Sequence, residues 1–360
     1  MTEGLGTALL LETPPPLLLW YGQNARDLPW RRDPAPYRVW LSEIMLQQTR
    51  VEAVKPYFAR FLEALPDIPA LARAPEPVLM KLWEGLGYYN RARNLQKAAR
   101  IVAEQYGGTL PASYEQLLKL PGFGPYTAGA VASFAFGLPV PAVDGNVLRV
   151  VSRLLASRAD ISRPEVKAAV SEGIRTVLEG IPDQAGSYNQ AIMELGATLC
   201  GPNTAPDCAA CPLSALCLGY RQGIARELPV KAPKRPRRAE NRTVFLLVFR
   251  GRAAVRRRPE QGLLAGLWEL PNAAGALTPA EARAWLREQG LEPVKLRALR
   301  PAKHIFTHVE WHMTGYLAET EAAGDGSLLW VSGQELREQY TIPSAFRAYS
   351  GILLELLEKG

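Results

Sequence analysis

The chain lacks the features of a membrane or secreted protein. No apolar run reaches eighteen residues, about the minimum for a helix that crosses a bilayer. The first apolar run has no basic region before it and is interrupted by Pro14, Pro15 and Pro16, so we expect neither a signal peptide nor a membrane span. We therefore expect a cytoplasmic protein with no membrane partner, whose four cysteines are reduced thiols or metal ligands.

The first part of the chain also lacks convincing strands. From Leu17 to about Arg221, amphipathic runs separated by proline and glycine predict helices. The proline-rich, basic stretch from Leu228 to Arg238 is typical of a linker. Strand-like segments follow at 243–249, 266–270, 300–306, 311–317 and 328–331, with one helix at 279–289 between them. This change of character predicts a separate α/β domain.

Size and charge fit a protein with several domains and a polyanionic partner. The chain has 360 residues, of which 48% are hydrophobic and 21% charged, enough for two or three folded domains. Its net charge of +7 favours a polyanion, although charge alone does not distinguish nucleic acid from other partners.

A glycine hairpin, LPGFGP, precedes a helix-like segment that begins near Tyr126. Gly122 and Gly124 have no Cβ, so they can adopt positive φ and let the backbone approach a ligand. The helix after them offers free N–H groups to an anion. A carboxylate, Asp144, follows one helix later. The combination predicts a grip on a nucleic-acid backbone with chemistry nearby.

Two carboxylates are candidates for an acid and base pair. Glu43 lies at helical spacing from Val39, Trp40 and Leu46, and such apolar neighbours would raise its pKa, as a general acid requires. Asp144 directly precedes a helix-like run, where aspartate is a preferred N-cap, and a capping carboxylate stays ionised. This pair would suit cleavage of a glycosidic bond. A solvated Glu43 and an Asp144 that only caps are the alternatives.

The four cysteines have the spacing C-x7-C-x2-C-x5-C at Cys200, Cys208, Cys211 and Cys217. Four thiolates this close in a reducing compartment indicate a metal site. Zinc and a [4Fe-4S] cluster both accept four cysteine ligands, and the spacing alone does not separate them.

Several motifs together resemble one enzyme family. SEIMLQQTR, GLGYYNRARNL, LPGFGPYTAGA, VDGNV, YNQAIMELG and the ordered cysteines are similar to the helix-hairpin-helix base-excision glycosylases, in particular their adenine-specific branch. The resemblance implies a multidomain α and α+β fold, with an all-α glycosylase core, an iron-sulphur cluster subdomain and a Nudix-like α/β domain. The implied boundaries are 1–221 for the helical region (about 31–137 for a six-helix barrel, 1–30 plus 138–221 for the cluster subdomain), 222–240 for the linker and 241–360 for the last domain.

The resemblance assigns the cysteines to a [4Fe-4S] cluster. The family usually has six residues between the first two cysteines, so the seven found here imply a loop insertion of one residue. The resemblance also makes Tyr126 informative about the type of glycosylase. Bifunctional relatives have a nucleophilic lysine at this position, which forms a Schiff base and cleaves the strand. Tyrosine cannot do so. The implied enzyme is a monofunctional glycosylase, with Tyr126 hydrogen-bonded near the reacting centre.

The resemblance also assigns roles to individual residues. Glu43 would protonate adenine N7, Asp144 would stabilise the oxocarbenium sugar, and Asn146 would support Asp144. The adenine would be flipped out of the duplex into a pocket. That pocket would be formed by Arg26, Leu28, Trp30, Arg31, Val51 and Gln190. The remaining DNA contacts would come from Leu46, from Gln48 and Tyr88 as wedges, from Thr49 and Leu86 toward the opposite base, and from the backbone of Gly122, Phe123 and Gly124.

The last domain resembles a Nudix module that has lost its metal site. GLWELPN is similar to the Nudix turn, but Ala284 and Arg287 stand where two glutamates would bind a cation. The domain would therefore recognise 8-oxoguanine, through Phe306, Thr307 and His308. The expected partner is double-stranded DNA with an A:8-oxoguanine or A:G mispair, bound by a monomer. The alternatives are a bifunctional lyase similar to endonuclease III, a non-catalytic iron-sulphur DNA-binding protein and a nucleotide hydrolase.

Overall fold

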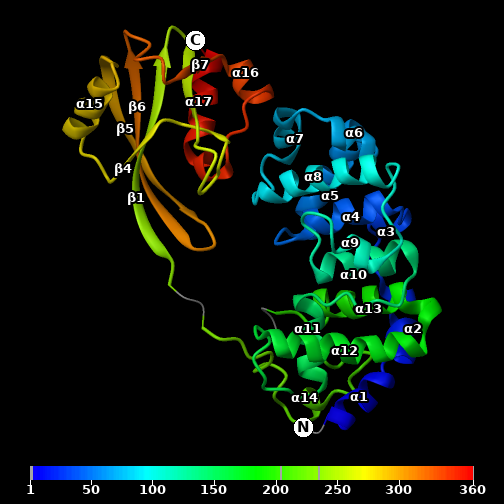
Figure 1. Cartoon of the computed structure of the whole chain (residues 1–360). Coiled ribbons are helices and arrows are strands. Elements are labelled where there is room, and N and C mark those ends of the chain that lie inside the picture. The colour runs from blue at the N-terminus through cyan, green and yellow to red at the C-terminus, as the bar shows by residue number, and fades with distance from the viewer. Residues whose placement is uncertain (1–2, 203–204, 234–235, 360) are drawn as a thin grey trace. The chain divides into compact units, whose positions relative to one another are not determined.

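The structure, a computed structural model, describes residues 3–202, 205–233 and 236–359. It divides into two compact units (Figure 1). The helical unit comprises Met1–Arg73 and Arg93–Pro233, and the sheet unit comprises Ala74–Ala92 and Lys234–Gly360. Among the described residues, no helix has both the length and the apolar character needed to span a membrane.

The helical unit contains no strand among its described residues, as the sequence predicts. Its helices are α1 (Glu3–Leu11), α2 (Pro14–Asn24), α3 (Pro29–Arg32), α4 (Pro36–Leu46), α5 (Val51–Ala64), α6 (Ile68–Arg73), α8 (Asn90–Gln105, from Arg93 on), α9 (Tyr114–Leu117), α10 (Pro125–Phe136), α11 (Gly145–Leu154), α12 (Pro164–Gly180), η1 (Pro182–Gln184), α13 (Ala185–Ala197) and α14 (Leu218–Arg221). Proline occupies the first turn of α2, α3, α4, α10 and α12, where its missing N–H costs no hydrogen bond.

Helix α10 is the centre of the helical unit and packs against α4 and α13. Its small side chains let neighbouring backbones come close. A Cβ on Gly129 would lie 2.0 Å from the carbonyl oxygen of Pro141, so only glycine allows the segment before Asp144 to cross α10 here. Asn189 of α13 fixes that segment further, because its amide accepts from Ala142 N at 3.2 Å and donates to the Val140 carbonyl at 2.9 Å.

The sheet unit is a mixed sheet with helices on both faces. Its strands are β1 (Arg238–Phe249), β2 (Arg252–Arg257), β3 (Trp268–Glu269), β4 (Asn272–Ala274), β5 (Pro293–Ile305), β6 (Val309–Thr320) and β7 (Leu329–Val331). The main order is β3-β2-β1-β6-β5, with β1 and β6 parallel, β4 paired to β1 and β7 paired to β2. Its helices are α7 (Glu76–Trp83), α15 (Pro279–Glu288), α16 (Gly333–Glu338), η2 (Ser344–Phe346) and α17 (Arg347–Lys359).

Strand β1 explains why the run TVFLLVF is continuously apolar. Val244 and Leu246 belong to a core with Leu353 of α17, whereas Phe245 and Leu247 belong to a core with α15. The two helices lie on opposite faces of the sheet (Figure 1). A strand covered on both faces needs no polar alternation. The predicted fold class, a helical region followed by an α/β domain, is confirmed.

Several local expectations were wrong. Strands β2 and β4 and the helical segments α16, η2 and α17 were not predicted, and helices begin at Glu3 instead of Leu17. The six residues of β2, RAAVRR, are half charged, and only the tertiary structure buries their apolar centre. Helix α16 does have a sequence signal, since Ser332 and Glu335 form a capping box.

The predicted linker also differs from the structure at both of its ends. Leu228 is buried, and its carbonyl accepts from the Arg153 Nε at 3.0 Å. At the other end, Arg238 is already the first residue of β1.

Candidate active site

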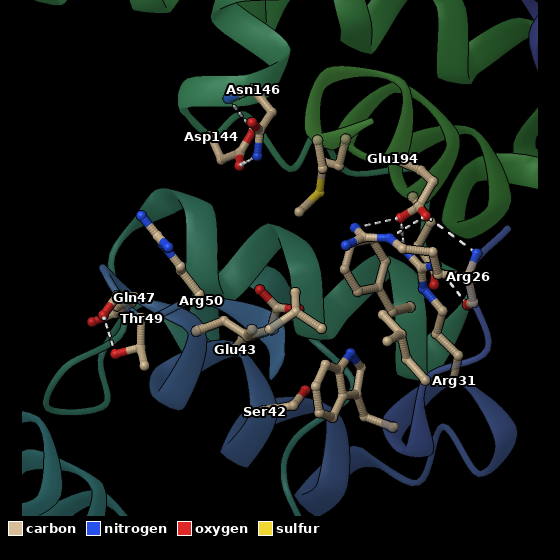
Figure 2. Close-up of a pocket in the computed structure, with 18 of the residues that line it drawn as sticks. Arg26, Arg31, Ser42, Glu43, Gln47, Thr49, Arg50, Asp144, Asn146 and Glu194 are labelled. Carbon is tan, nitrogen blue, oxygen red and sulfur yellow. Dashed lines mark hydrogen bonds and ion pairs between the residues drawn. The ribbon is translucent and has the colours of Figure 1, made fainter. Parts of the chain in front are cut away.

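A cavity of about 1060 Å³ opens in the helical unit. Side chains from α3, α4, α5, α10, α13 and the start of α11 line it. It gathers most of the residues predicted for the base pocket and the reaction, namely Arg26, Leu28, Trp30, Arg31, Glu43, Leu46, Gln48, Thr49, Val51, Tyr126, Asp144, Asn146 and Gln190. Figure 2 shows Asp144 and Asn146 at one side and Glu43 on the helix across from them.

Glu43 lies on α4 and is only 6% exposed. The hydroxyl of Tyr126 donates a hydrogen bond to its Oε2 at 2.5 Å. Burial raises the pKa of Glu43 to about 7; the Tyr126 hydrogen bond lowers it, the charge of Asp144 raises it and that of Arg31 lowers it. Half of the Glu43 side chains would therefore carry a proton near neutral pH.

Asp144 is the N-cap of α11, as the sequence predicts. Its Oδ1 accepts from the backbone N–H groups of Asn146 at 2.8 Å and Val147 at 2.9 Å, and its Oδ2 accepts from the Asn146 amide at 2.7 Å. Burial raises the pKa of Asp144, and these three hydrogen bonds oppose that rise. Both oxygens are held in place, so the carboxylate is fixed toward the cavity it lines.

The glycine hairpin presents backbone to solvent. Gly122 has φ of 82°, whereas Gly124 has φ of −92°, so the expectation of positive φ is wrong at the second glycine. A Cβ on Gly122 would also lie 3.0 Å from Asn94 Cβ. Phe123 is buried and stacks on Trp40 with ring centroids 5.3 Å apart. The aromatic contact anchors the hairpin while both glycines stay exposed.

The two predicted wedge residues have an unusual backbone. Gln48 has φ of 61° and Tyr88 has φ of 48°, and both side chains are exposed. Non-glycine residues adopt this left-handed conformation at a cost that is often found at binding sites. Leu86, by contrast, is buried, at 6% exposure.

The predicted 8-oxoguanine contacts lie at the turn between β5 and β6. Phe306 packs edge-on against Trp311, with centroids 4.9 Å apart, and leaves Thr307 and His308 exposed. Within the sheet unit, the hydroxyl oxygens of Thr307 and Tyr88 lie 3.2 Å apart. A residue expected to wedge into the base stack and a residue expected to contact 8-oxoguanine are thus neighbours.

All four cysteines line one small pocket. The Cys200 carbonyl accepts from Arg149 Nε at 2.8 Å and from Arg153 Nη1 at 3.0 Å, and Arg153 Nη1 also lies 3.2 Å from Cys200 Sγ. As the side chains stand, no group of three His, Cys, Asp or Glu within the described ranges is placed to hold an ion. Four thiols around one pocket are nevertheless the donor set of a cluster or zinc site.

Sequence reasoning missed Glu194, which also lines the cavity. It is 1% exposed and bonds to both Arg26 and Arg31 (Figure 2). A signal was available, because Glu194 follows the predicted Gln190 by four residues and therefore shares its helix face.

The fold and this cavity have clear counterparts among known proteins. Residues 41–176 match the family of HhH-GPD superfamily base excision DNA repair proteins, and residues 243–350 match the NUDIX domain. A thermostable thymine-DNA glycosylase structure aligns with TM-score 0.54 and 28% identity, over 62% of this chain and 100% of that one. An endonuclease III in a non-covalent DNA complex aligns with TM-score 0.51 and 26% identity, over 62% of this chain and 99% of that one. These matches define a DNA glycosylase of base excision repair.

The relatives narrow the class. Adenine DNA glycosylase of Mus musculus is 37% identical over 92% of this chain and 77% of its own length. The Schizosaccharomyces pombe enzyme is 30% identical over 89% of this chain and 85% of its own length. The Homo sapiens enzyme is 36% identical over 82% of this chain and 64% of its own length. The chain belongs to the adenine DNA glycosylase family. The enzyme class predicted from the sequence motifs is confirmed.

Proposed function

We propose that this enzyme removes adenine paired with 8-oxoguanine, or with guanine, from duplex DNA and leaves an abasic site. The observation that carries the proposal is Glu43, a buried carboxyl with a pKa near neutrality that faces the same cavity as a fully hydrogen-bonded Asp144. Two carboxyl groups in unlike environments suit the two tasks of breaking a glycosidic bond.

Glu43 acts as the general acid. A group with a pKa of about 7 carries its proton in a large fraction of molecules and still releases it readily. Delivered to N7 of adenine, that proton makes the base a better leaving group. Tyr126 orients the acid through its hydrogen bond to Oε2.

Asp144 stabilises the positive charge that develops on the sugar as the base leaves. Its two oxygens are held by Asn146 and Val147, so little reorganisation is needed when the charge appears. Asn146 is in turn held by a 2.7 Å hydrogen bond from Arg149 to its Oδ1.

The cavity receives a base that has been flipped out of the duplex. A volume of about 1060 Å³ is ample for a purine nucleoside, with Trp30, Leu28 and Val51 as apolar walls. Gln48 and Tyr88 fill the space left in the stack. The exposed backbone around Gly122 and Gly124 binds a phosphate and gives affinity without sequence information.

The sheet unit recognises the opposite 8-oxoguanine. Phe306, Thr307 and His308 are at an exposed turn, and Thr307 keeps the hydroxyl that a hydrogen bond to the lesion requires. The hydroxyl of Tyr88 beside Thr307 supports a shared role at the mispair. Ala284 and Arg287 on α15 cannot supply the carboxylates of a Nudix metal site, which favours recognition over hydrolysis.

Cleavage stops at base removal because Tyr126 stands where a lysine nucleophile would be needed. A phenol cannot form a Schiff base with the sugar, and this hydroxyl is already bonded to Glu43.

A substrate comparison tests the proposal. Single-turnover assays with adenine opposite 8-oxoguanine are expected to give abasic sites that break only after alkali. Adenine opposite guanine should react at least about tenfold more slowly, because contacts to the lesion are lost. Thymine glycol opposite adenine serves as the control substrate; strand nicking on it without alkali would instead identify a bifunctional lyase, and no base release from any duplex would identify a DNA-binding protein.

We propose that the cysteine pocket holds a [4Fe-4S] cluster, with Cys200, Cys208, Cys211 and Cys217 as ligands. The residues fit: all four thiols line one pocket, and Arg153 donates toward Cys200 Sγ, as suits an anionic cluster. When bound, such a cluster would cross-link the loop through these four cysteines. We also propose the functional division 1–221, 222–240 and 241–360, although by packing Ala74–Ala92 belong to the sheet unit and the helical unit extends to Pro233. A shared core of Leu10, Leu17, Val150 and Ile192 supports joining 1–30 with 138–221.

Colour and metal content test the cluster. The purified protein is expected to be brown, with iron and acid-labile sulphide in equal amounts, and Cys211→Ser is expected to lose both colour and several degrees of melting temperature. Ser214→Ala, in the same loop, is the matched control and should keep both. A colourless protein that contains zinc would contradict the assignment.

A further inference from the structure

Glu194 makes a dense set of charge-assisted contacts at the wall of the cavity. Its Oε1 accepts from Arg26 Nε at 2.6 Å and from the Arg26 backbone N–H at 3.2 Å. Its Oε2 accepts from Arg26 Nη2 at 3.0 Å and from Arg31 Nη2 at 2.8 Å. Burial would raise the pKa of Glu194, but the hydrogen bonds from Arg26 and Arg31 hold it below its ordinary value. Glu194 is therefore an anion throughout the neutral range.

The two arginines that it binds line the same cavity as Glu43. The Glu194 side chain is 0% exposed, against 19% for Arg31 and 37% for Arg26, so it binds the guanidinium groups from the protein side. Arg31 also donates to the Arg26 carbonyl at 3.1 Å and lies over the Tyr21 ring, with 5.5 Å to its centroid. Both cations are thus held in place at the cavity wall, by Glu194 and, for Arg31, also by the Arg26 carbonyl and the Tyr21 ring.

The positive charge at this wall affects the protonation of Glu43, because charged groups surround that carboxyl. Tyr126 of α10, Asp144 at the start of α11 and Arg31 of α3 all act on its carboxyl, and Arg31 is the cation among them. On the α5 side, Arg50 and Glu52 also line the cavity, and Glu52 is exposed and paired with Lys55 at 2.7 Å. Without Glu194, Arg31 would be an uncompensated cation acting on an acid that must keep its proton, and Arg26 would be a second cation lining the same cavity.

We propose that Glu194 is a positioning residue for base excision, which holds Arg26 and Arg31 and compensates their positive charge beside Glu43. Glu43 then keeps the proton that it transfers to the base, and the base, which becomes positive as it is protonated, is not repelled by the wall. The inference rests on the proposed role of Glu43 as the acid.

The test is the pH dependence of single-turnover adenine release opposite 8-oxoguanine. In Glu194→Gln, the alkaline limb of the profile is expected to move to lower pH by about one unit, the scale on which a nearby charge shifts a carboxyl group. In Arg31→Met the limb should move to higher pH, and in the double variant it should return toward that of the wild type. Glu194→Asp, which keeps the charge, should restore most of the profile.

Glu172→Gln is the matched control. Glu172 forms an exposed pair with Arg175 at 3.2 Å on α12, so its loss should leave the limb in place. Thermal melting shows which variants fold, and Arg31→Met and Glu194→Asp keep the test valid if Glu194→Gln does not. The inference would be overturned if the alkaline limb of the pH profile stayed in place in Glu194→Gln and Arg31→Met. It would also be overturned if the limb moved in the same direction in both variants. Normal activity of Glu43→Gln would instead overturn the proposed function.

Discussion

Replacing Glu43 by glutamine is expected to reduce the rate of adenine release by at least about a thousandfold, within the range attributed to a lost general acid. Glutamine has nearly the same size and can still accept the hydrogen bond from the Tyr126 hydroxyl. It cannot transfer a proton to the base. Single-turnover kinetics measures the loss, and a fluorescence titration with uncleavable duplex should show affinity within about threefold of the wild type, since Glu43 is buried and carries no phosphate contact.

The same substitution should make the protein more stable at alkaline pH. The pKa of Glu43 is about 7 in the fold against 4.5 when exposed, so the folded state binds the proton more tightly than the unfolded state. Stability due to Glu43 is greatest below pH 4.5, falls as pH rises to about 7, and is constant above. Glutamine at position 43 does not ionise, so the variant does not lose this stability as the pH rises. The gain in unfolding free energy should be on the order of 3 kcal/mol at pH 8, from 1.36 kcal/mol per pKa unit.

Urea denaturation at about pH 5 and pH 8 measures this difference. Glu194→Gln serves as the contrast, because its carboxylate is bound to two arginines and its removal should destabilise the protein at both pH values. Equal stability of wild type and Glu43→Gln at both pH values would show that Glu43 is solvated, the alternative left open by its sequence.

Replacing Asp144 by asparagine is expected to have a similar catalytic cost, also at least about a thousandfold, because the charge that stabilises the sugar cation is lost. The fold should change little. Asparagine is as good an N-cap as aspartate, so it can still accept the backbone hydrogen bonds from Asn146 and Val147. Base release and thermal unfolding, measured on the same preparation, separate the two roles.

Asp144→Ala is the matched variant that removes cap and charge together. It should lose about 1 kcal/mol of stability, the usual cost of an N-cap, in addition to the catalytic loss. If asparagine kept full activity and only alanine lost it, Asp144 would be a structural cap and not a participant in the reaction.

The site could be predicted to a large extent because its parts are local in sequence. Asp144 and Asn146 are two residues apart, and the capping geometry that they form depends only on the helix that follows. Glu43 has its apolar neighbours within one or two helical turns. Tyr126 follows the hairpin directly. Such short-range relations are visible in the sequence, and the family resemblance joins them.

Other features could not be predicted from residues close together in the sequence. Strand β2 depends on pairing with β1, β3 and β7, and its charged sequence gives no alternation. The difference between Gly122 and Gly124 depends on backbone conformation, which the two identical residues do not reveal. Leu86 is buried by its surroundings, although an apolar residue between two glycines could equally have been exposed.

The sequence by itself determined which chemical groups the enzyme has: a carboxyl in an apolar helix, a capping aspartate, a tyrosine in place of lysine and four cysteines. Only the tertiary structure decided how those groups behave. Glu194 meets Arg31 across 163 residues of chain, and Tyr126 meets Glu43 across 83. Burial and ion pairing depend on every atom brought within a few ångströms, so the pKa of Glu43 and the neutralised wall beside it arise only when distant helices pack together.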